Sequence, residues 1–190
     1  MASLTTRTAK INVVLSLKGY DIKKTLDRLK EFCATYMQVY AFILHDRDIL
    51  ENGENKTPHI HLIGLMNNNR QRLGTILTEI CDNCELEPFA ITIDKMSDIV
   101  GSIQYLIHKN NAEKYQYDVG DIITNLSESE LMTYLNSDSK SISIEYLVSV
   151  IEKNRSKIEI MREIGLTYYH LYRNTINDIY REIWESVFNN

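Results

Sequence analysis

β-Branched and aromatic residues concentrate in four short stretches of the N-terminal half, and such stretches predict β-strands. They lie at residues 10–17, 37–45, 58–66 and 89–93. The segment between the second and third stretches is rich in Asn, Glu and Gly, which is the composition of a turn. We therefore predict that the second and third strands form a hairpin.

Three further stretches place apolar residues every three or four positions, as amphipathic helices do. The first covers residues 21–36 and can be capped by Asp21, and the second covers residues 70–84. The third begins near Asp98 and extends through Lys109. The order strand, helix, strand, strand, helix, strand, helix predicts an α+β fold, an antiparallel sheet with packed helices.

The composition changes after this α+β domain, which we place at residues 1–125. Residues 126–140 are polar around a short helix and are predicted to be a boundary region. Residues 141–190 are predicted to form a helical C-terminal domain in which a Gly-Leu-Thr turn at 165–167 separates two helices. This is the form of a helix-turn-helix, and a small three-helix bundle for oligomerisation is the alternative.

Composition narrows the possible environments and partners. The net charge of −5 over 190 residues argues against coating nucleic acid nonspecifically, so DNA would be bound through local patches. No apolar run is long enough to span a membrane, and no hydrophobic signal core opens the chain. The three cysteines are an odd number without secretory context, which predicts a cytoplasmic protein without disulfides.

Candidate metal ligands lie on the predicted hairpin. His59 and His61 alternate with apolar residues in Pro58-His59-Ile60-His61-Leu62, so both imidazoles project from one face of the strand. The hairpin turn brings the end of the preceding strand, with His45 and Asp48, beside them. Imidazoles suit several divalent metals, which predicts a metal site. The alternative is that each histidine is merely packed or solvated.

A candidate nucleophile lies on the third predicted helix. Tyr105 falls outside the apolar stripe of this helix, and Lys109, four residues later, shares its face. Gly101 and Ser102, one turn earlier, are small enough to leave room for a ligand beside the hydroxyl group. The alternative is an ordinary half-buried tyrosine, one of 12 in the chain.

The candidate metal ligands and the helix that carries Tyr105, taken in order along residues 8–125, resemble the three motifs of the HUH endonucleases. Their spacing is most similar to that of replication initiators from small rolling-circle plasmids of Gram-positive bacteria. The resemblance implies that His45, Asp48, His59 and His61 bind a divalent cation, Mn²⁺ or Mg²⁺.

By the same resemblance, Tyr105 matches the catalytic tyrosine and Lys109 is a candidate to assist it. Lys109 follows Tyr105 by four residues where some relatives have a spacing of three, and His108 stands at that position. Whether His108 or Lys109 assists stays open. Asp46 does not match a ligand position.

The function implied by this resemblance is that of a plasmid replication initiator, an enzyme that nicks one DNA strand at the origin and transfers it. The tyrosine would form a 5′-phosphotyrosyl intermediate and release a 3′-OH that primes synthesis. Implied partners are the single-stranded nick site, the duplex origin and host replication proteins such as a helicase, without membrane contact. The cluster at 168–174 is a candidate reader of duplex repeats, with homo-oligomerisation as the alternative role of residues 141–190.

Three other functions fit part of the pattern. A conjugative relaxase that mobilises a plasmid would use the same chemistry on a different target site. A nucleotide metallohydrolase would need a third histidine in the strand, where Ile63 stands. A non-catalytic DNA-binding regulator would use only the helical C-terminus.

Overall fold

The computed structural model divides the chain into two compact units, residues 1–139 and 140–190, which are described separately. The residues described are 3–67, 71–137, 144–153, 156–164 and 176–185. Within the first unit, the predicted α+β fold with an antiparallel sheet is confirmed.

Five strands form the main sheet, in the order β6-β2-β4-β3-β7, and each pairs antiparallel with its neighbours. The predicted hairpin is present as β3 and β4, and β6 starts after a 3₁₀ turn at Pro88–Ala90. The strands are β2 (Lys10–Ser16), β3 (Met37–His45), β4 (His59–Met66), β6 (Ile91–Lys95) and β7 (Ile123–Thr124). Two shorter strands, β1 (Arg7–Thr8) and β5 (Gln71–Arg72), pair separately.

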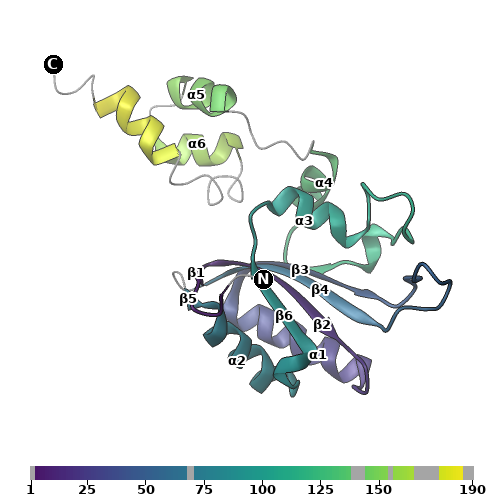
Figure 1. The fold of residues 1–190 in the computed structure, drawn as a ribbon. Coiled ribbons are helices and arrows are strands. Elements are labelled where there is room, and N and C mark those ends of the chain that lie inside the picture. Colours follow the sequence, from purple (N-terminus) through teal and green to yellow (C-terminus); the bar gives the residue numbers. More distant parts are fainter. Residues whose placement is uncertain (1–2, 68–70, 138–143, 154–155, 165–175, 186–190) are drawn as a thin grey trace. The chain divides into compact units, whose positions relative to one another are not determined.

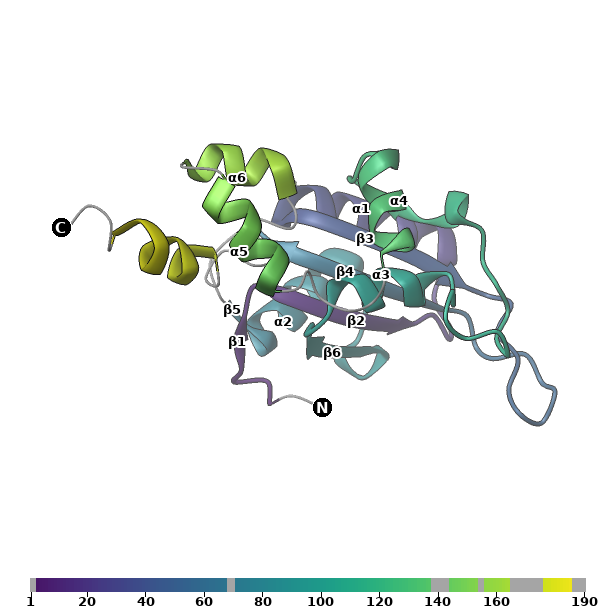
Figure 2. The ribbon, with the colours of Figure 1, turned by 90° about the horizontal axis from the view of Figure 1, so that it is seen from above.

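Helices cover both faces of the main sheet (Figure 1). Helices α1 (Ile22–Tyr36) and α2 (Leu73–Cys84) pack on one face, and α3 (Ile99–Leu106) with α4 (Glu128–Asn136) lies on the other. Figure 2 views the first unit from the side of α3 and α4. The predicted cap of α1 is confirmed, because the backbone amide of Lys24 donates to the Asp21 carboxylate at 2.9 Å.

The main core lies between the sheet and the pair α1 and α2. Alternate residues of β2 and β4 face this core and are fully buried, among them Val13, Ile60 and Leu62. Residues between them on each strand therefore face α3, since the side-chain period of a strand is two. This alternation turns His59 and His61 away from the main core.

The predicted boundary region, 126–140, contains α4, which contacts α3 and belongs to the first unit. A capping box starts this helix, in which Ser127 and Glu130 bond to each other's backbone amides. The cysteines Cys33, Cys81 and Cys84 are free and buried. Among the described residues, no helix combines the length and apolar character needed to cross a lipid bilayer.

The second unit is helical, as far as it is described. It contains α5 (Ile144–Lys153), α6 (Lys157–Ile164) and a helical stretch at 176–185 that ends in a π turn at Arg181–Glu185. Their shared core is built on four buried residues, Val150, Ile151, Ile160 and Ile176. The predicted Gly-Leu-Thr turn at 165–167 and the cluster at 168–174 lie outside the described residues.

Candidate metal centre and nucleophile

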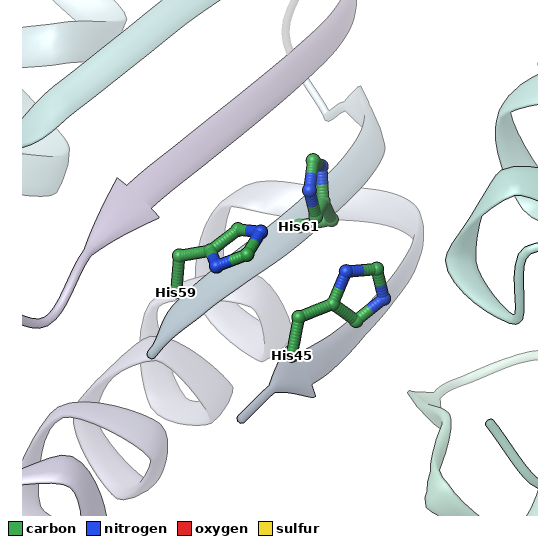
Figure 3. Close-up of side chains that lie close together, drawn as sticks. All are labelled: His45, His59 and His61. Atoms are coloured by element: carbon green, nitrogen blue, oxygen red, sulfur yellow. The ribbon is translucent and has the colours of Figure 1, made fainter. Parts of the chain in front are cut away.

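Three imidazoles gather where β3 ends and β4 begins. His45 pairs across the ladder with His59, and Ile43 pairs with His61, so the three histidines share the face toward α3. Figure 3 shows their rings turned toward one another above the two strands. The ring centres of His45 and His61 are 4.7 Å apart, and those of His59 and His61 are 5.0 Å apart.

The hydrogen bonds of two histidines leave one ring nitrogen of each available as a ligand. His45 Nε2 donates to the Leu106 carbonyl at 2.7 Å, so its Nδ1 carries a lone pair. That Nδ1 is buried and has no hydrogen-bond partner. His59 Nδ1 likewise donates to the Thr57 carbonyl at 3.0 Å, which leaves Nε2 with a lone pair.

Asp48 completes the arrangement. Its Oδ2 lies 3.6 Å from His45 Nδ1 and 3.7 Å from His59 Nε2, the two ring nitrogens that carry no proton. Ligands bound at about 2.1 Å to one ion lie roughly 3 to 3.4 Å apart, so a small contraction would suffice. The Lys56 ammonium, which donates to His59 Nε2 at 3.4 Å, would have to move aside.

The described residues therefore fit a divalent ion. His45, His59 and His61 offer ligand atoms within 4.8 Å of one another, and so do His45, Asp48 and His108. A buried ring nitrogen without a partner is costly unless something binds it. These groups could hold a metal ion, and all four residues of the predicted ligand set are among them.

Burial keeps the imidazoles in the form that binds metal. It lowers the pKa of His45 to about 4, and burial beside the other imidazoles lowers the pKa of His61 to about 2. Burial also lowers the pKa of His59. The histidines are therefore neutral at pH 7, so protons compete little with a cation.

Tyr117, to which sequence reasoning gave no role, holds Asp48 in place. Its hydroxyl donates to Asp48 Oδ1 at 3.2 Å and accepts from the backbone amide of Arg47 at 3.0 Å. Its ring stacks on His45 with centres 4.3 Å apart and planes 7° apart. Burial raises the pKa of Tyr117 to about 12, so the hydroxyl stays a donor. Asp48 and Tyr117 are 69 residues apart in the sequence, so no short sequence motif predicts their hydrogen bond.

Tyr105 lies beside the imidazole cluster. Its side chain is 39% exposed, and its ring centre is 5.2 Å from that of His61. The Lys114 ammonium donates to the Tyr105 hydroxyl at 2.9 Å and lies 4.8 Å from the centre of the ring. Lys114 is thus the cation at this hydroxyl, and sequence reasoning did not single it out.

Lys109 is placed differently from its expected position on the face of Tyr105. Helix α3 ends at Leu106, and the backbone amides of His108 and Lys109 donate back to Tyr105 and Gln104. This is a Schellman ending, with His108 in the left-handed conformation at φ +56°. The side chain of Lys109 then donates to the Leu135 carbonyl at the end of α4.

His108, the other candidate assistant, is almost fully buried between Tyr105 and the predicted metal ligands. Its Nδ1 donates to the Tyr115 carbonyl at 2.8 Å and lies 3.8 Å from Asp48 Oδ1. Its Nε2 is buried without a hydrogen-bond partner. His108 is thus placed to act on the ligand set rather than as a proton donor from solvent.

Asp46 and the neighbouring cysteines Cys81 and Cys84 stay apart from this cluster. Asp46 is exposed and pairs with the Arg47 guanidinium at 3.6 Å. Cys84 is packed into the main core with Cys81, and burial raises its pKa to about 12. Both cysteines therefore act as small apolar residues.

An antiparallel sheet that carries a cluster of histidines and a carboxylate, with a tyrosine beside it, defines a candidate metal site with a candidate nucleophile. A comparison with protein families identifies the family of the chain. Residues 20–130 match the family described as plasmid replication protein, origin binding domain. This stretch covers more than half of the chain, which therefore belongs to that family, and it contains every predicted metal-ligand and catalytic residue.

Two curated proteins are similar to parts of the chain. "Replication protein RepB" of Lactiplantibacillus plantarum is 36% identical over 81 residues, which are 43% of this chain and 34% of that protein. "Replication protein" of Onion yellows phytoplasma (strain OY-M) is 27% identical over 119 residues, covering 54% of this chain and 29% of that protein. The match thus spans about a third of the length of each relative.

Metal affinity should follow the contacts described above. We expect Tyr117→Phe to weaken Mn²⁺ binding about tenfold, because Asp48 loses the bond that orients it. His61→Ala removes a ligand and should weaken binding more. Isothermal titration calorimetry with Mn²⁺ measures both effects. Cys81→Ser is the control and should bind like the unaltered chain; an equal loss in this variant would contradict the assignment.

The free energy of unfolding of the metal-free protein should decrease as the pH falls. The pKa values of His45 and His61 are lower in the folded chain than the value of about 6.5 for free histidine. Below that pH the unfolded chain binds protons that the folded chain does not, so the free energy of unfolding decreases as pH falls from about 6.5 to about 4 through His45, and further to about 2 through His61.

Urea denaturation in excess chelator measures this free energy at each pH. His61→Gln, which cannot titrate, should reduce the slope. A free energy of unfolding that stays constant between pH 7 and pH 5 would show that the cluster is not buried as described.

Proposed function

We propose that this protein is a plasmid replication initiator that nicks one DNA strand at the origin and transfers it, in a metal-dependent reaction. The observation that carries the proposal is the position of Tyr105, whose ring centre lies 5.2 Å from that of His61 in the imidazole cluster. A nucleophilic hydroxyl beside a cation site suits phosphoryl transfer, because one phosphate can reach both.

The proposed reaction exchanges one phosphodiester for another. The Tyr105 oxygen bonds to phosphorus as the bond from phosphorus to the 3′-oxygen breaks. The hydroxyl proton leaves, and the departing 3′-oxygen takes up a proton. The products are a 5′-phosphotyrosyl protein and a free 3′-OH, and the reverse steps rejoin a strand without further energy input.

Each side chain of the cluster has a role in this proposal. His45, Asp48, His59 and His61 hold the cation, for which Mn²⁺ or Mg²⁺ is proposed. When bound, the cation withdraws negative charge from the oxygens of the scissile phosphate. His108 packs against His45, with ring centres 4.4 Å apart, and positions the ligand set.

Lys114 is proposed as the group that assists Tyr105. Its ammonium already donates to the hydroxyl oxygen, so it can stabilise the negative charge that forms as the proton leaves. Lys109, the group expected from the motif spacing, donates instead to α4 and is proposed to fix that helix against α3.

The family match favours replication over conjugative mobilisation, because the description of the family names plasmid replication and origin binding. The proposed partners are the unpaired nick site, the duplex origin and host replication proteins, in the cytoplasm. A non-catalytic DNA-binding regulator would not need a tyrosine hydroxyl that accepts a hydrogen bond from a lysine and lies beside three imidazoles.

Tyr105→Phe should abolish cleavage of a single-stranded origin oligonucleotide, because no other oxygen replaces the nucleophile. The covalent protein–DNA adduct, detected by its shift on a denaturing gel in the presence of Mn²⁺, should disappear. Tyr115→Phe is the matched control, since Tyr115 is 41% exposed and bonds to Arg47 instead. An adduct that persists in Tyr105→Phe and maps to Tyr115 would overturn the assignment.

Lys114→Met should lower the cleavage rate at pH 7 about 100-fold, the usual loss when one charge-stabilising donor is removed. The deficit should shrink as pH rises, because hydroxide then helps to form the phenolate. Lys114→Arg should keep most of the rate. Lys109→Met is the control: it should lower the thermal unfolding temperature while the rate of the folded protein stays within a few fold. If Lys109→Met lowered the cleavage rate strongly and Lys114→Met left it within a few fold, Lys109 would be the assisting group instead.

A further inference from the structure

A cavity of about 340 Å³ lies beside Tyr105, on the α3 side of the sheet. Asn12 of β2 and His61 of β4 contribute from the sheet, while Asp98 and Ser102 contribute from the start of α3. The volume of the cavity is at the lower end of the range for small-molecule sites and is large enough for a nucleobase with its sugar. Tyr105 and His61, which line this cavity, take part in the proposed reaction, but that reaction assigns no role to Asn12, Asp98 or Ser102.

The lining of the cavity indicates a base rather than a phosphate. None of the described residues that line it is a lysine or arginine, the side chains that normally bind phosphate. Its polar groups are a carboxylate, an amide and hydroxyls, which can hydrogen-bond to the edge of a base. The rings of Tyr105 and His61 add faces on which an unpaired base can stack.

Asp98 is the group best placed to discriminate among bases. It precedes α3, yet its side chain makes no capping hydrogen bond to that helix. A Cβ at Gly101 would come within 2.5 Å of Asp98 Oδ2, so the missing side chain at Gly101 makes room for the carboxylate. Ser102 donates its hydroxyl hydrogen to the Asp98 carbonyl at 2.5 Å, which leaves lone pairs on its oxygen.

We propose that this cavity binds the base of a nucleotide next to the scissile phosphate and selects bases that carry an exocyclic amino group. The proposal rests on the function proposed above. A carboxylate can only accept hydrogen bonds, and an exocyclic amino group offers it two N–H donors. Thymine offers a single N–H between two carbonyl oxygens that would face the carboxylate, so Asp98 favours adenine, cytosine or guanine over thymine. Because Tyr105 lines the cavity, the selected base adjoins the cleaved bond. A base enters a cavity of this size only when it is unstacked from its neighbours, so the cavity also favours single-stranded substrate.

The test uses the 190-residue chain with Mn²⁺ and oligonucleotides carrying each of the four bases at the two nucleotides that flank the cleaved bond. At one of these positions, kcat/KM should be about tenfold higher for an amino-bearing base than for thymine. Asp98→Asn should remove this preference while the Tyr105 adduct still forms. Gly101→Ala should remove it too, because the added Cβ displaces the carboxylate without changing the charge.

Asp82→Asn is the matched control, since it removes the same charge from an exposed position on α2. It should keep the preference. A preference that survives in Asp98→Asn, or that is lost equally in Asp82→Asn, would overturn the proposal.

The two proposals can fail separately. If the unaltered chain cleaves none of the oligonucleotides, the nicking function fails. The cavity is then tested by fluorescence anisotropy of the same oligonucleotides bound to Tyr105→Phe. A base preference that depends on Asp98 supports the cavity, and equal affinity for all bases at both positions overturns it.

Discussion

The antiparallel pairing of His45 with His59 is the contact on which the site depends. A shift of one residue in this ladder would turn His59 and His61 into the apolar core and would expose Ile60 and Leu62 to the α3 side. Burial of these apolar residues against α1 and α2 therefore fixes the register. The same packing that stabilises the fold positions the imidazoles.

A second constraint is the early end of α3. His108 adopts the left-handed conformation, which costs about 1 to 2 kcal/mol for a residue with a side chain. The Schellman bonds and the bond from His108 to the Tyr115 carbonyl offset part of this cost. Because the backbone changes direction at His108, the next segment passes over the site and places Lys114 and Tyr117 there. A local backbone feature thus supplies two groups of the cluster.

Sequence reasoning succeeded where short-range patterns decide the structure. The order of the main strands and helices along the chain, the β3–β4 hairpin and the cap at Asp21 follow from periodicity and turn composition, and the structure confirms each. Spacing along an ideal helix placed Lys109 beside Tyr105, but α3 ends before that spacing applies. The role of Tyr117 escaped prediction because it depends on a contact between distant segments.

The imidazole cluster also lowers the stability of the folded chain. His45 Nδ1 and His108 Nε2 are buried without hydrogen-bond partners, and each such atom costs about 1 to 3 kcal/mol. Apolar residues would fill the same space without that cost, so packing alone does not explain the histidines. A cation bound only by the folded chain would recover part of this loss, about 2.7 kcal/mol at a concentration 100 times its Kd. Occupancy of the predicted site would therefore stabilise the sheet domain, because the predicted histidine ligands lie at the end of β3 and the start of β4.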